Sequence, residues 1–86
     1  MSLPTIPING TKRILVVEDN LHVRQIVAQA LEIEGYLVQQ AHDGSGALQF
    51  MEHFTPNLII SEFHMPKMSG LELYEVVRKN PQWVTI

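Results

Sequence analysis

The stretch Asn57-Leu-Ile-Ile-Ser-Glu-Phe-His-Met-Pro-Lys-Met-Ser-Gly70 decides the fold of this chain. Its first apolar residues, Leu58–Ile60, form a short run that is typical of a strand buried on both faces of a parallel sheet. Near its end, Ser69 is followed three positions later by Glu72, and this capping box predicts the start of a helix. The stretch therefore predicts a strand, a polar loop that contains Glu62, and a helix, in that order.

A similar unit of strand and helix stands upstream. Ile14–Val17 is a second short apolar run, and it ends in the polar residues Glu18 and Asp19. Asn20 is suited to cap the start of a helix, and Gly35 is suited to end it. We expect one apolar face of this helix to pack on the sheet. The residues at the required helical spacing are Val23, Ile26, Val27, Ala30 and Leu31.

A third unit lies between these two. Residues 36–41 predict a more polar strand at a sheet edge, residues 42–46 a turn, and residues 47–54 a short helix. We expect the helix that begins after Ser69 to end at Asn80–Pro81, and residues 83–86 to approach a fourth strand. In that helix, the residues expected to face the sheet are Leu71, Tyr74 and Val77, with Leu73 as a further candidate.

Three successive units of strand and helix predict an α/β fold, with a parallel sheet and helices on both faces. In a flavodoxin-like, doubly wound sheet of strand order 2-1-3-4-5, Glu18, Asp19 and Glu62 meet at the carboxyl ends of neighbouring strands. Three carboxylates repel one another unless a cation neutralises them, and Mg²⁺ prefers oxygen ligands. Taken alone, Glu18 and Asp19 could also form a solvated turn that favours the dipole of the next helix.

Residues 13–20 and 57–70 resemble the receiver domain of two-component response regulators, and the resemblance extends from Lys12 to Ile86. Its most specific part is the pattern Met-Pro-x-Met-x-Gly that ends at Gly70. The resemblance implies a cytoplasmic phosphorelay module that is not an enzyme. It places Glu62 where the family has the aspartate that accepts a phosphoryl group. The Mg²⁺ ligands that it implies are Glu18, Asp19, Glu62 and the backbone carbonyl of His64.

Glutamate at the acceptor position changes the expected chemistry. Its extra methylene displaces the carboxylate of Glu62 by roughly 1.5 Å, about one carbon–carbon bond. Such a shift can reduce the rate of phosphoryl transfer by orders of magnitude. The domain could therefore be a degenerate receiver that acts as a protein-binding module, or Glu62 could mimic the phosphorylated form. A third interpretation is that Glu62 is an engineered substitution in an ordinary receiver.

The resemblance also implies functional residues that follow a fourth and a fifth strand, which these 86 residues do not include. We therefore expect residues 12–86 to be the N-terminal portion of a receiver domain, with about three β-α units, and the gene product to be longer. Otherwise the unpaired edge of the third strand could form a homodimer. The implied partners are a sensor histidine kinase or phosphotransfer protein and an output domain.

Composition narrows the remaining classes of function. The net charge of −3 gives no reason to expect nucleic-acid binding, and no apolar run has the roughly 20 residues of a membrane span. We expect residues 1–11 to be a flexible leader that could derive from an expression vector. The alternative function is a small flavodoxin-like enzyme with a metal or cofactor site, but no glycine-rich phosphate loop follows the first strand.

Overall fold

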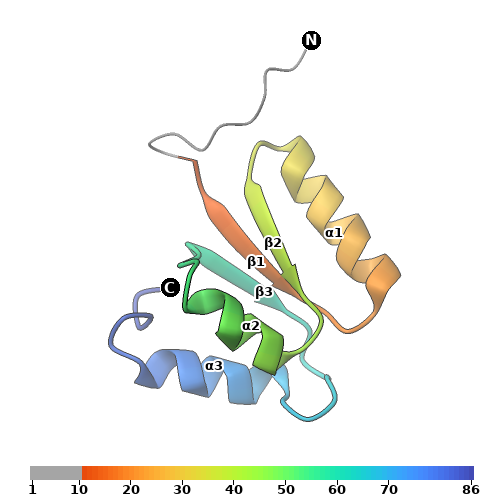
Figure 1. Ribbon diagram of the computed structural model, residues 1–86. Helices are drawn as coiled ribbons and strands as arrows, with labels where there is room; N and C mark the ends of the chain where they lie inside the picture. The colour runs from red at the N-terminus through yellow and green to blue at the C-terminus, as the bar shows by residue number, and fades with distance from the viewer. Residues whose placement is uncertain (1–10) are drawn as a thin grey trace.

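The computed structural model describes residues 11–86, so the expected leader lies outside the described residues except for Thr11. Strands and helices alternate along the chain, and the three strands form one parallel sheet of order β2-β1-β3 (Figure 1). This arrangement confirms the predicted flavodoxin-like α/β fold with three units of strand and helix. The elements are β1 (Arg13–Val17), α1 (Leu21–Ile33), β2 (Leu37–Ala41), α2 (Gly44–Met51), β3 (Leu58–Ser61) and α3 (Gly70–Lys79).

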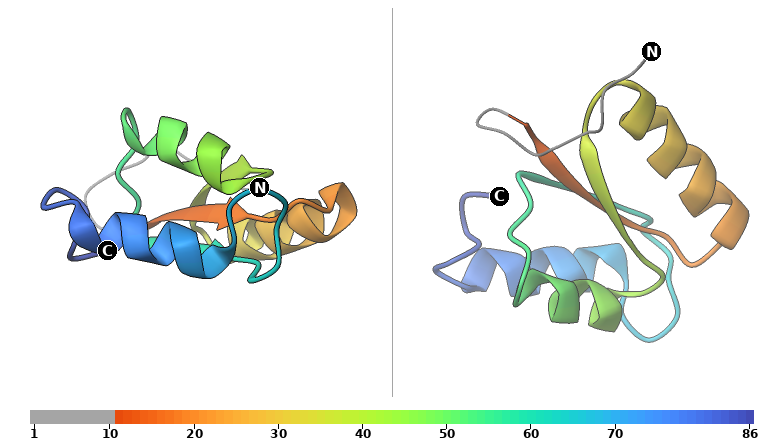
Figure 2. Two further views of the ribbon diagram at one scale, coloured as in Figure 1. Left: turned by 90° about the horizontal axis from the view of Figure 1, so that it is seen from below. Right: turned by 45° about the horizontal axis from the view of Figure 1, so that its top comes forward.

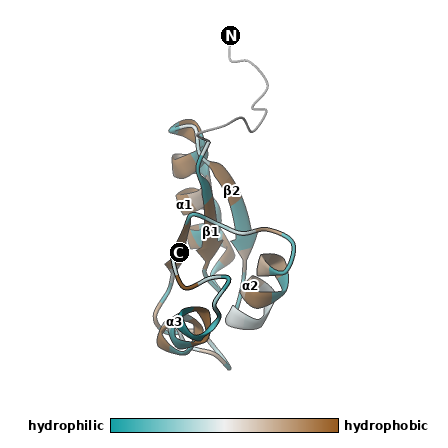
Figure 3. Ribbon diagram, turned by 90° about the vertical axis from the view of Figure 1, so that its left-hand side faces the viewer, coloured by the Kyte–Doolittle hydropathy of each residue, from teal (hydrophilic) through white to brown (hydrophobic). Residues whose placement is uncertain are grey.

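The central strand β1 is the centre of the core, as its apolar run predicts. Leu15 and Val17 are fully buried and pack in one cluster with α2 and α3. Ile14 and Val16 alternate with them and are buried on the opposite side of the strand, where α1 lies. Figures 2 and 3 show the resulting layers, with α1 on one side of the sheet and α2 on the other. The members of the main cluster are Leu15, Val17, Ala41, Ala47, Met51, Met65, Leu73, Val77 and Trp83.

The helix ends follow local sequence signals. The side chain of Asn20 accepts a hydrogen bond from the Val23 N–H at 3.0 Å, and it caps α1 as predicted. Both halves of the predicted capping box at the start of α3 are present, between Ser69 and Glu72. Helix α2 begins earlier than expected, because Asp43 caps it and residues 44–46 belong to its first turn instead of a separate loop.

Strand β3 is less buried than its apolar run predicts. Leu58 is 50% exposed and Ile60 is 37% exposed. Strand β3 pairs only with β1 among the described residues. Helix α1 lies beside β2, at the edge of the sheet opposite to β3 (Figure 1). The expectation of burial on both faces is therefore wrong for β3. Within residues 11–86, no further strand pairs with its outer edge, and no helix covers the face that carries Leu58 and Ile60.

Two helix faces also differ from the predictions. In α1, Ala28 is buried, whereas Val23 and Ile26 are exposed, because the part of the helix that contacts the sheet is narrower than the apolar stripe. In α3, Leu73 and Val77 face the core. The other two predicted residues of α3, Leu71 and Tyr74, are exposed.

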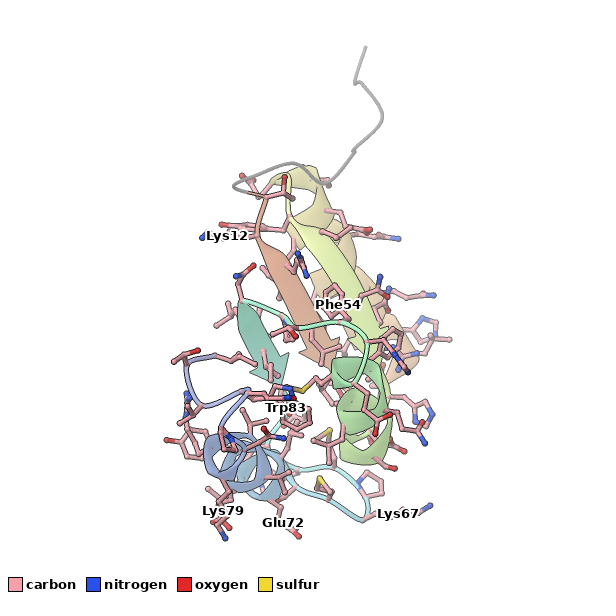
Figure 4. The ribbon with its side chains drawn as sticks, turned by 60° about the vertical axis from the view of Figure 1, so that its left-hand side comes forward. Lys12, Phe54, Lys67, Glu72, Lys79 and Trp83 are labelled. Atoms are coloured by element: carbon pink, nitrogen blue, oxygen red, sulfur yellow. The ribbon has the colours of Figure 1, made fainter. Side chains whose placement is uncertain are left out.

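The last residues form a turn instead of the approach to a fourth strand. The Trp83 N–H donates to the carbonyl of Asn80 at 3.0 Å, and the Ile86 N–H donates to the carbonyl of Trp83 at 2.9 Å. The side chain of Trp83 is buried in the main cluster, whereas Lys79 and Glu72 point away from the core (Figure 4). Burial of this large aromatic ring favours the turn over an extended segment. Within residues 11–86, no helix is both long and apolar enough to cross a membrane.

Candidate functional site

The candidate site lies where β1 and β3 end side by side. The two strands pair in register up to Val17 and Ser61, and the Glu62 N–H extends the ladder by donating to the Val17 carbonyl at 2.9 Å. Because the strands are parallel, the residues that follow them reach the same rim of the sheet. The rim therefore receives Glu18 and Asp19 from β1 and Glu62 from β3, as the sequence predicts.

Glu18 is the most buried of the acidic residues at this rim, with 9% of its surface exposed. Its Oε2 accepts a hydrogen bond from the Asn20 N–H at 3.0 Å. Its backbone carbonyl accepts a hydrogen bond from Nη1 of Arg24 at 2.8 Å. Arg24 thus connects the first turns of α1 to the acidic loop, a contact that no pattern in the sequence identifies.

The pKa of Glu18 shows that the carboxylates influence one another. The hydrogen bond from the Asn20 N–H lowers the pKa of Glu18, but opposing effects outweigh it and raise the pKa above its ordinary value of 4.5. These effects are partial removal from water, a hydrogen bond with the Asp19 side chain, and the negative charges of Glu62 and Asp19. The fold therefore brings all three predicted carboxylates into one electrostatic group.

Glu62 itself is exposed, and its side chain turns back onto its own loop. Its Oε1 accepts a hydrogen bond from the Phe63 N–H at 3.0 Å and a longer one from the His64 N–H at 3.4 Å. The carboxylate is thus engaged by the main chain that follows it. His64, predicted to supply a carbonyl, enters the site in this structure through its N–H.

Close contact with the start of α3 fixes the loop after β3. The Gly70 N–H donates to the carbonyl of Phe63 at 2.8 Å. A Cβ atom on residue 70 would lie 2.5 Å from the carbonyl oxygen of Glu62, so only glycine fits at this position. Within the same loop, Lys67 has a φ of 69°, and its side chain extends outward (Figure 4).

The donor chemistry of the rim suits a hard cation, because carboxylate oxygens are the ligands that Mg²⁺ prefers. Within residues 11–86, however, no three His, Asp or Glu side chains already surround a single point as metal ligands would. Two of the carboxylates have main-chain partners instead, since Glu18 binds the Asn20 N–H and Glu62 binds the N–H groups of its own loop. A cation would therefore have to draw these side chains together.

The sequence model of the response regulator receiver domain matches residues 14–86. The chain belongs to this family. It is therefore a receiver domain of two-component phosphorelay signalling, and the family match favours this function over a flavodoxin-like enzyme.

Comparisons with individual proteins and solved structures support the same family. The chain is 39% identical over 83 residues to the CAI-1 autoinducer sensor kinase/phosphatase CqsS of Vibrio cholerae, a match that covers 93% of this chain and 12% of that protein. The structure resembles the chemotaxis response regulator CheY4 of Vibrio cholerae with a TM-score of 0.82 at 35% identity, covering 86% of this chain and 62% of CheY4.

The response regulator TrrA of Thermotoga maritima, solved in complex with Mg²⁺ and BeF, has a TM-score of 0.79 at 36% identity. That match covers 84% of this chain and 63% of TrrA. The same TrrA has also been solved in complex with the histidine kinase ThkA. The chain thus spans less than two thirds of each of these proteins.

Proposed function

We propose that this receiver domain works as a degenerate, protein-binding module of a phosphorelay, and that Glu62 holds it in one signalling state. The observation that supports this most directly is the position of the Glu62 carboxylate, which accepts hydrogen bonds from the N–H groups of Phe63 and His64. A nucleophile must approach the phosphorus atom in line and within a fraction of an ångström of its productive position. A longer side chain that is folded back onto its own loop meets this requirement poorly.

We propose Mg²⁺ as the cofactor of this rim, with Glu18, Asp19, Glu62 and the backbone carbonyl of His64 as ligands. The raised pKa of Glu18 supports a cation, because that pKa partly reflects repulsion from the neighbouring carboxylates that a positive charge would relieve. When bound, Mg²⁺ would offset the negative charge of a phosphoryl donor. Glu62 has two carboxylate oxygens, so one of them could serve the cation while Oε1 keeps its main-chain hydrogen bonds.

A second candidate is that Glu62 mimics the phosphorylated form. The exposed carboxylate of Glu62 places a negative charge in the loop that follows β3. It carries one charge, whereas a phosphoryl group carries nearly two. A comparison of partner binding by wild-type protein and by the Glu62→Gln variant separates the two candidates, because only a mimic loses binding when the charge is removed.

For partners, we propose a sensor histidine kinase or phosphotransfer protein and an output domain, all in the cytoplasm. TrrA, a structural neighbour, forms a complex with the histidine kinase ThkA, which supports a kinase partner. The candidate site lies at the rim of the sheet, where a phosphorylated side chain of such a partner could approach it. The net charge of −3 gives no support for nucleic acid as a partner of this segment.

We also propose that residues 11–86 can form a homodimer through β3. The outer edge of β3 has no partner strand among the described residues, and an apolar groove beside it is lined by Leu58, Phe63, Leu71 and Tyr74. A second copy of the chain offers the same edge and the same groove. Light scattering should show a dimer that the variant Leu71→Asp disrupts and that Val76→Asp, outside the groove, preserves. A monomeric wild-type protein contradicts this proposal.

The decisive experiment is intact-mass analysis of the full-length gene product after incubation with Mg²⁺ and a small phosphodonor. We expect wild-type protein to keep its mass and the Glu62→Asp variant to gain one phosphoryl group. The Glu62→Gln variant controls for phosphorylation of other residues. A phosphoryl group on wild-type Glu62 would show that the acceptor chemistry survives, and it would overturn the degenerate function.

A further inference from the structure

A side chain of α1 holds the main chain of the loop that joins β1 to α1 (Figure 1). Nη1 of Arg24 donates a hydrogen bond to the carbonyl of Glu18 in this loop, at 2.8 Å. Arg24 lies four residues after the helix cap Asn20, and its N–H donates to the Asn20 carbonyl at 2.9 Å. Helical side chains lean toward the N-terminus of their helix, so the guanidinium of Arg24 reaches back past the cap to the loop.

Arg24 completes the set of hydrogen bonds around Glu18. The Glu18 N–H donates to the carbonyl of Ala41 at 3.1 Å, and Oε2 of Glu18 accepts a hydrogen bond from the Asn20 N–H at 3.0 Å. Both of these partners are main-chain groups, whereas the partner of the Glu18 carbonyl is a side chain. A substitution of Arg24 therefore removes this one hydrogen bond and leaves the partners of the other two in place.

Arg24 orients the acidic loop without neutralising it. Its guanidinium binds a carbonyl, and within residues 11–86 no arginine or lysine forms an ion pair with Glu18, Asp19 or Glu62. The pKa of Glu18 agrees with this, because the effect that lowers it is the hydrogen bond from Asn20, and no cation contributes. The negative charge of the rim is thus left for a metal ion to offset.

We propose that Arg24 is a positioning residue of the Mg²⁺ site, and that it holds the loop in the path that brings the carboxylates of Glu18 and Asp19 to the rim. The inference rests on the proposed function, since it requires Mg²⁺ at the rim. It adds a residue that acts on the ligands and does not itself bind the cation. Loss of a group that holds metal ligands in place typically weakens metal binding by about 10–100-fold.

The test is a titration of MgCl₂ into wild-type and variant proteins, followed by NMR at the backbone amides of Asp19 and Asn20. In Arg24→Met, which keeps a long side chain but loses its donors and its charge, we expect the Kd for Mg²⁺ to rise about tenfold. Loss of a positive charge near the rim would by itself lower this Kd, because like charges repel. Positioning and charge therefore predict changes of opposite sign.

Two further variants serve as controls. Arg24→Lys restores a charged donor on a long side chain, so we expect its Kd for Mg²⁺ to lie between those of wild-type protein and Arg24→Met. Arg78→Met is the matched control, because Nη1 of Arg78 also donates to a main-chain carbonyl, that of Val84, but at the end of α3 that lies away from the rim. Its Kd should equal that of wild-type protein.

Metal-free protein provides a second measurement. In Arg24→Met the carbonyl carbon resonance of Glu18 should move upfield, because its hydrogen bond is lost. The Asn20 N–H should exchange faster with solvent, since its acceptor on Glu18 is less well held. Neither change is expected in Arg78→Met. If Arg24→Met does not fold, Arg24→Gln, whose neutral side chain is shorter than that of arginine, replaces it with the same expected results.

Three results would overturn this inference alone: a Kd for Mg²⁺ in Arg24→Met that equals or falls below that of wild-type protein, no recovery of affinity in Arg24→Lys, and an unchanged Glu18 carbonyl resonance in metal-free Arg24→Met. In each case wild-type protein still binds Mg²⁺, so the proposed cofactor stands. A wild-type protein that binds no Mg²⁺ overturns the proposed cofactor together with this inference, and the two failures are thereby distinguished.

Discussion

The backbone of Gly70, at the start of α3, lies directly against the backbone of Glu62, at the end of β3. A Cβ atom on residue 70 would come within 2.5 Å of the Glu62 carbonyl oxygen and 3.1 Å of the Phe63 Cα. The Gly70 N–H also donates to the Phe63 carbonyl. This contact fixes the orientation of the peptide groups that hold the Glu62 carboxylate, and it links the packing of α3 to the chemistry of the rim.

We expect the Gly70→Ala variant to be destabilised by about 1–3 kcal/mol, the usual range for overpacking, because its methyl group would meet backbone atoms that cannot move away. Denaturant unfolding followed by the fluorescence of the buried Trp83 measures this change. The matched control is Gly44→Ala, because the three atoms nearest to its added Cβ, at 2.6 to 3.0 Å, belong to the side chain of Met68 and not to the backbone. If both variants lose equal stability, the backbone contact of Gly70 has no special role.

Lys67 adopts a left-handed backbone conformation, with a φ of 69°, that side chains with a Cβ atom disfavour. We expect Lys67→Gly to raise the free energy of unfolding by about 0.5–1 kcal/mol, because glycine adopts this conformation without steric conflict although it loses more entropy on folding. Lys67→Ala is the control, since it removes the long side chain and keeps the Cβ. Thermal or denaturant unfolding should rank glycine above lysine, and alanine no higher than lysine. The opposite ranking would show that steric conflict of the Cβ atom at residue 67 does not limit stability.

Much of the fold could be predicted because its signals are local. The apolar run of β1, the Asn20 cap and the capping box of Ser69 and Glu72 each depend on residues within a few positions of one another. Exposure at Val23 and Ile26 could not be predicted in the same way, because it depends on how many strands lie beneath α1. The low burial of Leu58 has a similar cause, since a strand with one neighbour has the same sequence pattern as a strand with two.

In the candidate site, too, some features could be predicted from the sequence and others depend on distant parts of the fold. The meeting of Glu18 and Glu62 at one rim could be predicted, because parallel strands bring their carboxyl ends together. The hydrogen bonds of the Glu62 carboxylate to its own loop could not, because the peptide orientation there depends on Gly70, eight positions further along the chain. The link from Arg24 to the Glu18 carbonyl likewise depends on the three-dimensional path of the β1–α1 loop.

Stability should depend on pH through Glu18. The pKa of Glu18 is raised in the folded state above its ordinary value of 4.5, so the folded protein favours the protonated form. Its contribution to stability is fully present below about pH 4.5 and is lost as the pH rises through the folded-state pKa. We therefore expect Glu18→Gln, which retains an acceptor for the Asn20 N–H, to be more stable than wild-type protein at pH 7.

The measurement is the difference in the free energy of unfolding between wild-type protein and Glu18→Gln from pH 4 to pH 8, which cancels the titration of other groups. The advantage of the variant should shrink as the pH falls toward 4.5. Glu75→Gln, on α3 and outside the carboxylate group, serves as the control for the removal of one carboxylate charge. A constant difference across the range would show that the raised pKa does not govern stability.

Mg²⁺ should stabilise the wild-type protein, because a cation bound only to the folded state adds its binding free energy to the stability. At a Mg²⁺ concentration ten times the Kd, the expected gain is about 1.4 kcal/mol, and a chelator should reverse it. The gain should fall sharply in the Asp19→Asn variant, since that change removes a proposed ligand, and it should persist in Asp43→Asn, whose carboxylate caps α2. The raised pKa of Glu18 should also fall when Mg²⁺ binds, because the cation favours the charged carboxylate. Equal stabilisation of all three proteins by Mg²⁺ would mean that the cation acts through general ionic strength and that the acidic rim is not its binding site.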